Sequence, residues 1–114
     1  MSTNIIRYEL EQAASKATQE FLDKHFGGKD GGLCGFAWVT IFPEHKGNTT
    51  LGKQERKILE ALGARKDYTG KAYQIWNPSN NHCQSVDAKS AGAVAAAEVL
   101  KKYGFKAYAA DRLD

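Results

Sequence analysis

The chain of 114 residues has few residues that impose unusual geometry or chemistry, with only two cysteines and two prolines. Cys34 and Cys83 are too few for a disulfide framework, so free thiols in a reducing compartment are expected. They lie far apart in the sequence, and the three histidines are scattered, so no zinc-binding spacing appears. The sequence therefore predicts neither a disulfide scaffold nor a metal site.

Long apolar runs are also missing. No run approaches the roughly 20 residues that span a bilayer, and the first residues form no uninterrupted signal core. These absences predict a cytoplasmic protein without membrane partners. The hydrophobic share of 42% and the charged share of 25% are typical of a folded globular chain. The net charge of +3 is compatible with an anionic partner but does not require one.

Recognisable catalytic and cofactor motifs are absent too. The glycine-rich segment 27–32 lacks the Gly-Lys-Ser/Thr ending of a phosphate loop. Asp111 and Asp114 are close in sequence, but no third group accompanies them for acid–base work. No complete catalytic constellation can be assembled, so a non-enzymatic protein without a cofactor is expected.

Three helices are predicted from apolar spacing and from end signals. Apolar residues between positions 6 and 22 recur at helical spacing, and Gly27 stops that helix. Thr49 or Thr50 caps a second helix that ends at Gly63. Its predicted buried stripe is Leu51, Ile58, Leu59 and Leu62. The third helix covers about 86–103.

Three strands are predicted between and after these helices. Residues 33–42 form a nearly unbroken apolar run, which predicts a central strand buried on both faces. Segment 71–76 alternates, with Ala72, Gln74 and Trp76 on one face and Tyr73 and Ile75 on the other. The segment from 105 to the terminus is the last strand.

The order α-β-α-β-α-β predicts one α/β (α+β) domain over residues 1–114. We expect a two-layer sandwich, with a small three- to four-stranded sheet and helices packed on it. The N-terminal helix covers 1–26 and the α/β core 33–114. Segment 71–110 reads as a β-α-β unit, right-handed if its strands are parallel. Gly92 costs the third helix roughly 1 kcal/mol and is expected to pack closely against the sheet beside Gly35 and Ala37.

The adjacent pair His82 and Cys83 has two interpretations. A cysteine nucleophile needs a base within hydrogen-bond reach, which sequence neighbours in an extended chain seldom provide. The alternative is that Cys83 is a small apolar residue packed beneath a loop.

The start of the third helix is the first candidate ligand site, at Gln84, Ser85, Asp87 and Lys89. Ser85 or Asp87 can simply cap the helix. A helix N-terminus also attracts anions, and an aspartate at the cap suits a ligand with donors, such as a ribose or a base edge. Arg112, at the end of the last strand, either clamps an anion or forms a surface ion pair. Trp38 or Trp76 would supply stacking.

A basic stretch is the second candidate site. Its cations are followed by aromatic residues, a combination that suits phosphate contacts and base stacking. The alternative is a solvated charged face. The residues concerned are Lys53, Arg56, Lys57, Arg65 and Lys66.

Several short motifs together resemble a family of short, uncharacterised bacteriophage and bacterial proteins. They are GFAWV at 35–39, QSVD at 84–87, AGAVAAAEVLKKYGFKAY at 91–108 and DRLD at 111–114. The resemblance implies a phage-type setting, in the host cytoplasm, and no established activity. His82 and Cys83 lie outside the motifs.

These features predict a small binding protein for an anionic or nucleotide-like ligand. In a phage setting it would sequester a host nucleotide signal as an anti-defence protein. The alternatives are a nucleic-acid-binding module that uses the basic stretch, or an inhibitor that contacts a host protein directly. A homo-oligomer is compatible with each of them.

Overall fold

The computed structural model describes residues 2–113 of the chain. Three helices and a four-stranded antiparallel sheet make a small α+β fold. The helices are α1 (Thr3–Phe26), α2 (Thr50–Ala61) and α3 (Val86–Lys102). The strands are β1 (Gly35–Phe42), β2 (Arg65–Lys66), β3 (Tyr73–Trp76) and β4 (Lys106–Leu113). The predicted fold class is confirmed, with the short β2 as an added fourth strand.

The sheet order is β2-β3-β1-β4, and every neighbouring pair is antiparallel. Since β3 and β4 both run against β1, they run in the same direction with β1 between them. The β3–α3–β4 segment is therefore a crossover between parallel strands that are not neighbours. β1 lies at the centre, and β4 forms an edge.

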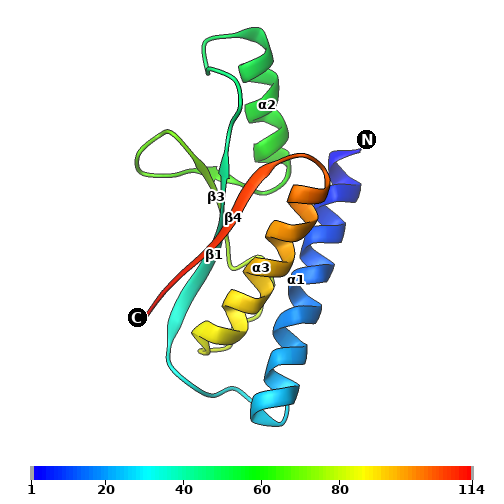
Figure 1. Ribbon diagram of the computed structural model, residues 1–114, viewed down its shortest axis with the longest axis vertical. Helices are drawn as coiled ribbons and strands as arrows, with labels where there is room; N and C mark the ends of the chain where they lie inside the picture. Colours follow the sequence, from blue (N-terminus) through cyan, green and yellow to red (C-terminus); the bar gives the residue numbers. More distant parts are fainter. Residues whose placement is uncertain (1, 114) are drawn as a thin grey trace.

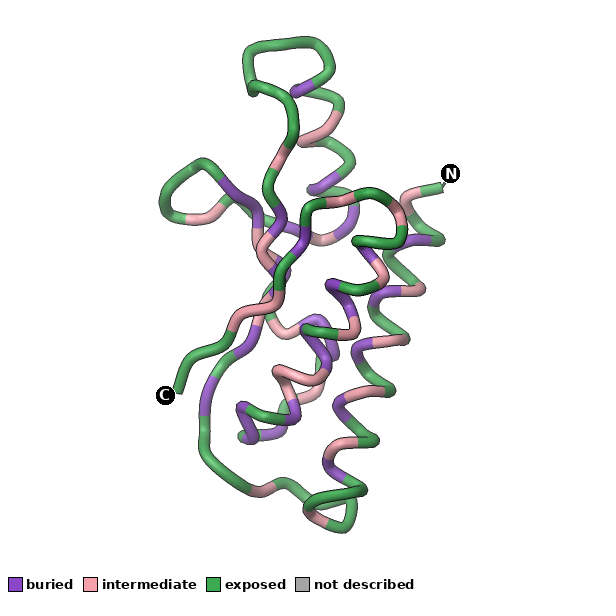
Figure 2. The backbone as a smooth tube through the Cα atoms, viewed as in Figure 1, coloured by how far each residue is buried: buried purple, intermediate pink, exposed green. Residues whose placement is uncertain are grey.

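Helices α1 and α3 lie side by side and cover one face of the sheet (Figure 1). Along β1 the buried residues alternate with exposed or half-buried ones, and the chain colouring shows the same alternation (Figure 2). Ala37, Val39 and Ile41 point into the core, where they join Leu10 of α1 and Leu100 of α3. The prediction of a strand buried on both faces is wrong, because within residues 2–113 no helix covers the second face, where Phe36 and Phe42 are exposed.

The helix ends follow the local sequence closely. Helix α1 ends at Gly27, whose φ of 62° is the left-handed conformation that glycine adopts readily. The side chain of Thr49 accepts a hydrogen bond from the N–H of Gly52 and so caps α2, as predicted. Ser85 caps α3 in the same way through the N–H of Ala88.

The predicted buried stripe of α2 is only half right. Leu59 and Leu62 are buried, whereas Leu51 and Ile58 are exposed. Helix α2 stands beyond the end of the sheet (Figure 1), so only its C-terminal turn reaches the core. Helical spacing in the sequence predicts an apolar stripe on a helix. It does not predict how much of that stripe is buried by neighbouring elements.

Gly92 packs against α1 rather than against the sheet, which corrects the prediction. A Cβ at this position would lie 2.4 Å from Oγ1 of Thr18 and 3.0 Å from the carbonyl oxygen of Ala14. The Thr18 hydroxyl is buried and donates a hydrogen bond of 2.7 Å to the carbonyl of Ala88. At Gly35 the backbone of β1 comes close to the start of α3 and to β4, since a Cβ there would lie 2.7 Å from the Val86 side chain and 2.4 Å from the carbonyl oxygen of Arg112.

Candidate functional site

The start of α3 is already filled by the chain itself. The N–H groups of Gln84 and Ser85 donate to the carboxylate of Asp30 at 2.6 and 3.2 Å, and the N–H of Val86 donates to the carbonyl of Leu33. The hydrogen bond from Gln84, followed by that from Ser85, holds the pKa of Asp30 below its ordinary value despite some desolvation. An external anion would have to displace Asp30. The negative charge expected at this helix start is therefore supplied by a side chain of the protein itself.

Around Phe36 the structure gathers two of the predicted cations. Nζ of Lys89 lies 5.6 Å from the centre of the Phe36 ring and donates to the carbonyl of Gly35 at 3.2 Å. The guanidinium of Arg112, directly opposite Phe36 in the sheet, is also 5.6 Å from the ring centre. The side chain of Gln84 lines the same hollow as Phe36 and Lys89. Phe36 itself was missed because it lies inside an apolar run that was interpreted as core.

The two predicted tryptophans are neighbours on the sheet. Trp38 of β1 and Trp76 of β3 are register partners, and their rings stack with centres 4.8 Å apart and planes at 27°. Phe36 meets the Trp76 ring edge to face at 6.3 Å. The indole N–H of Trp76 donates a hydrogen bond to Oε1 of Gln74, and this bond fixes the orientation of the Trp76 ring. Phe36, Trp38 and Trp76 form what we call the aromatic cluster.

A second aromatic pair lies farther along the same face. The rings of Phe42 and Tyr108 meet at 5.9 Å, and Nζ of Lys101 lies 5.6 Å from the Tyr108 ring. Both residues alternate with buried neighbours, Ile41 and Ala107, and therefore point away from the helices. Phe42 and Tyr108 are 45% and 53% exposed. Large aromatic surfaces thus occupy both ends of an uncovered face.

This uncovered side of the sheet, which we call the open face, carries cations but no carboxylate on its strands. Its described strand positions are Phe36, Trp38, Thr40, Phe42, Arg65, Gln74, Trp76, Lys106, Tyr108, Ala110 and Arg112. Asp111 is the one acidic residue in the described parts of the strands. It points toward α3, where it accepts a hydrogen bond from Ser90 at 2.8 Å. Negative ligands therefore meet no carboxylate from the strands of this face, and Glu44, which follows β1, is paired with Lys106 at 3.9 Å.

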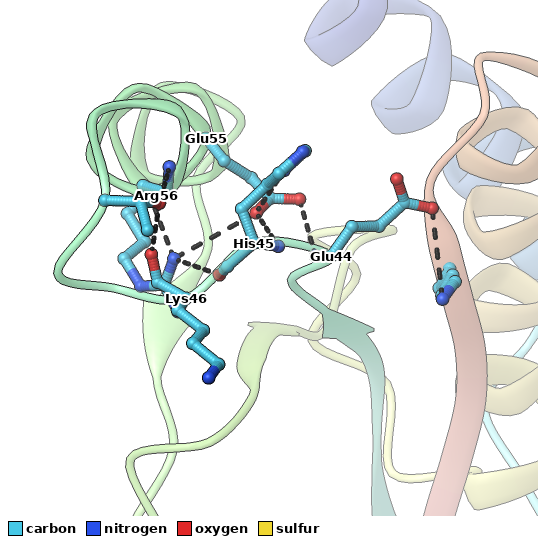
Figure 3. A network of polar contacts seen from close by, with 8 residues as sticks. Glu44, His45, Lys46, Glu55 and Arg56 are labelled. Atoms are coloured by element: carbon cyan, nitrogen blue, oxygen red, sulfur yellow. Dashed lines mark hydrogen bonds and ion pairs between the residues drawn. The ribbon is translucent and has the colours of Figure 1, made fainter.

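The predicted basic stretch is divided between different roles. The guanidinium of Arg56 donates to the carbonyls of His45 and Gly52 at 2.9 and 3.0 Å, so it ties the loop before α2 to the helix (Figure 3). Lys53 and Lys57 are exposed on α2, and Arg65 and Lys66 are exposed on β2. Arg65 pairs with Gln74 and thereby belongs to the open face.

The same loop is held by Glu55 of α2. Its carboxylate accepts hydrogen bonds from the N–H groups of Glu44 and His45 at 2.8 and 2.9 Å (Figure 3). Partial burial disfavours the charged form, but these donors together with the His45 side chain outweigh it and keep the pKa of Glu55 below its ordinary value. The hydrogen bonds of Glu55 and Arg56 thus hold the loop before α2 against the helix.

The pair His82 and Cys83 is separated by burial. Cys83 is buried, and this burial raises the pKa of its thiol. His82 is exposed. The exposed thiol is that of Cys34, which donates to Oε1 of Gln84 at 3.2 Å. Within residues 2–113, no group of three or more potential metal-binding side chains forms, and no helix could cross a membrane.

Of the seven predicted ligand residues, five converge around Phe36: Gln84, Lys89, Arg112, Trp38 and Trp76. Ser85 is buried as the helix cap, and Asp87 is exposed on α3. Comparison with family models, curated proteins and solved structures finds no match for the chain. The resemblance to phage proteins thus stays a prediction, and the function has to be inferred from the site.

Proposed function

We propose that this protein binds a nucleotide-like anionic ligand, without catalysis, at the aromatic cluster of the open face. The observation that carries the proposal is the stacked pair Trp38 and Trp76 beside Phe36, with Lys89 and Arg112 at the same ring. Aromatic faces stack on nucleobases whatever their identity. Arginine matches the geometry of phosphate oxygens and binds them with two hydrogen bonds.

The surrounding charges support this ligand. The side chain of Arg112 forms no ion pair or hydrogen bond with another residue in the part of the chain that the structure describes. Its donors can therefore turn to a phosphate while the guanidinium stays over Phe36. Gln84 lines the adjoining hollow and adds an amide that can pair with a base or sugar. In the phage setting that the resemblance implies, such a protein would sequester a nucleotide signal of the host.

Tryptophan fluorescence provides a direct test, because the only two tryptophans of the chain both belong to the cluster. Titration with mono-, di- and cyclic nucleotides is expected to quench this fluorescence, with matching heat in calorimetry. Phe36→Ala should weaken binding at least about fivefold, since stacking on one aromatic side chain is worth about 1–3 kcal/mol per base. Arg112→Gln should also weaken binding, because it removes the charged hydrogen-bond donors proposed for the phosphate.

Tyr8→Ala is the matched control. Tyr8 is 67% exposed on α1, on the helical side of the molecule, so its removal should leave binding unchanged. No quenching, no heat and no change in melting temperature with any nucleotide would overturn the proposal.

A further inference from the structure

The open face is longer than one nucleotide needs. Its residues form four rows across β1, led by Phe36, Trp38, Thr40 and Phe42, and these rows are two residues apart. Successive rows are therefore about 6.8 Å apart, at about 3.4 Å per residue. The face extends roughly 20 Å from the first row to the last on the same spacing.

Each row contributes an aromatic ring. The first row holds Phe36 with Arg112, and the second holds the stacked tryptophans. The third row runs from Tyr108 through Thr40 and Gln74 to Arg65. The fourth holds Phe42 opposite Lys106. Aromatic rings thus recur at a spacing of about 6.8 Å, twice the 3.4 Å rise per nucleotide of a stacked strand.

Cations accompany the rings along the whole length. Lys89 and Arg112 lie at the first row, Arg65 and Lys101 beside the third, and Lys106 at the fourth. Two of these cations are paired with carboxylates, Lys101 with Glu98 at 3.4 Å and Lys106 with Glu44 at 3.9 Å, whereas Lys89, Arg65 and Arg112 form no ion pair among the described residues. A positively charged track with interleaved aromatics binds single strands, because the phosphates follow the charges and the splayed bases stack on the rings.

We infer that the ligand of the open face is a single-stranded nucleic acid lying along β1, with three to four unstacked bases on successive rows. This inference rests on the proposed function, because it takes the aromatic cluster as one part of a longer site. A duplex is excluded from this mode, since its bases are stacked and their faces are not available.

A length series of oligonucleotides tests the inference. Thymidine and uridine oligomers of one to eight nucleotides are titrated while tryptophan fluorescence is recorded. Affinity is expected to rise with each added nucleotide up to about four and then to level off. The DNA and RNA arms show whether the 2′-hydroxyl matters, and a rise in either arm supports the inference.

Tyr108→Ala separates the longer site from the cluster. It removes the ring of the third row, so the tetranucleotide should bind at least about fivefold more weakly, whereas the mononucleotide should bind with unchanged affinity. Should Tyr108→Ala fold poorly, Lys101→Gln removes the cation beside the same ring instead. It should likewise weaken binding of the tetranucleotide and leave binding of the mononucleotide unchanged. The salt dependence gives a second readout for Lys101→Gln, since losing one phosphate contact makes the negative slope of log K against log salt less steep by about 0.7 for a single strand.

The outcomes distinguish the two proposals. Equal affinity for one and four nucleotides overturns the inference and leaves the proposed function standing. Preferential binding of duplex overturns the inference in the same way. No binding of any nucleotide or oligonucleotide overturns both, including the case in which a protein partner is captured by the open face instead.

Discussion

Alternate residues of β1 point to opposite faces of the sheet, one covered by helices and the other open. Ala37, Val39 and Ile41 are aliphatic and are buried beneath α1 and α3. Phe36 and Phe42 point the other way and are 37% and 45% exposed, although they are larger and offer more apolar surface to bury. The covered face packs aliphatic side chains against the helices, whereas the rings of the open face pair with one another and with nearby cations. The exposed aromatic rings of the open face thus suit stacking with a flat ligand better than packing against a helix.

The largest expected effect comes from breaking the covered face. Ile41→Ala should lower the free energy of unfolding by about 2–5 kcal/mol, because it leaves a cavity in a fully buried site. The neighbouring change Thr40→Ala, on the open face, should cost less than about 1 kcal/mol. Urea denaturation followed by circular dichroism measures both. Equal costs would show that something covers the open face in solution, such as a second copy of the chain.

A smaller effect is expected from adding one methyl group between the helices of the covered side. Gly92→Ala gains about 1 kcal/mol of helix propensity but forces a Cβ against Thr18 and the Ala14 carbonyl, an overpacking that costs about 1–3 kcal/mol. We expect a net loss of stability in the same denaturation assay. Val94→Ala, exposed on the same helix, is the control and should show no loss. If Gly92→Ala were instead more stable than the parent protein, α1 and α3 would be able to move apart slightly without a loss of stability, which would contradict this prediction.

A pH-dependent effect is expected at Asp30, which lies between α1 and β1 and accepts hydrogen bonds at the start of α3. Its pKa is lowered in the folded protein, first by the hydrogen bond from Gln84, so its carboxylate stabilises the fold above the unfolded pKa of about 3.9. This contribution is lost as the pH falls through the lower folded pKa. Asp30→Asn should therefore lower the melting temperature at pH 7, and its difference from the parent protein should shrink below about pH 4. A difference that stays constant with pH would contradict this role.

The smallest effect on stability is expected at the cysteines. Cys34 is exposed beside the open face, whereas Cys83 is buried with a raised thiol pKa. At neutral pH an alkylating reagent should label Cys34 first and Cys83 only after unfolding, as mass spectrometry can follow. Cys34→Ser should leave the melting temperature unchanged. Equal labelling rates in the folded protein would show that the segment around Cys83 opens readily.

The elements of the fold were predictable from local signals. Gly27, Thr49, Ser85 and the alternation in 73–76 act within a few residues of the backbone, so their effects are present in the sequence itself. The partner of Gly92 was not predictable in this way. Its neighbour Thr18 is brought there only by the packing of α1 on α3.

The candidate site was partly predictable. Trp38, Trp76, Lys89 and Arg112 were named from residue type and from their places at element ends, and the structure brings them together around Phe36. Phe36 was missed, yet a signal was present. Aromatic residues fall at 36, 38 and 42, while aliphatic ones fall at 37, 39 and 41, a period of two within the apolar run. That alternation distinguishes two different faces where overall hydrophobicity does not.

The sequence by itself determined the three helices, the three longer strands and their order, together with the helix caps, because these depend on neighbours along the chain. The two-residue strand β2 forms only through its pairing with β3. Only the tertiary structure decided which face is covered, since α1 and α3 pack together on a single side of the sheet. It also decided that Asp30 occupies the start of α3, more than fifty residues away in sequence. Contacts over such separations depend on how the whole chain packs, and this packing leaves the aromatic side of the sheet open to a ligand.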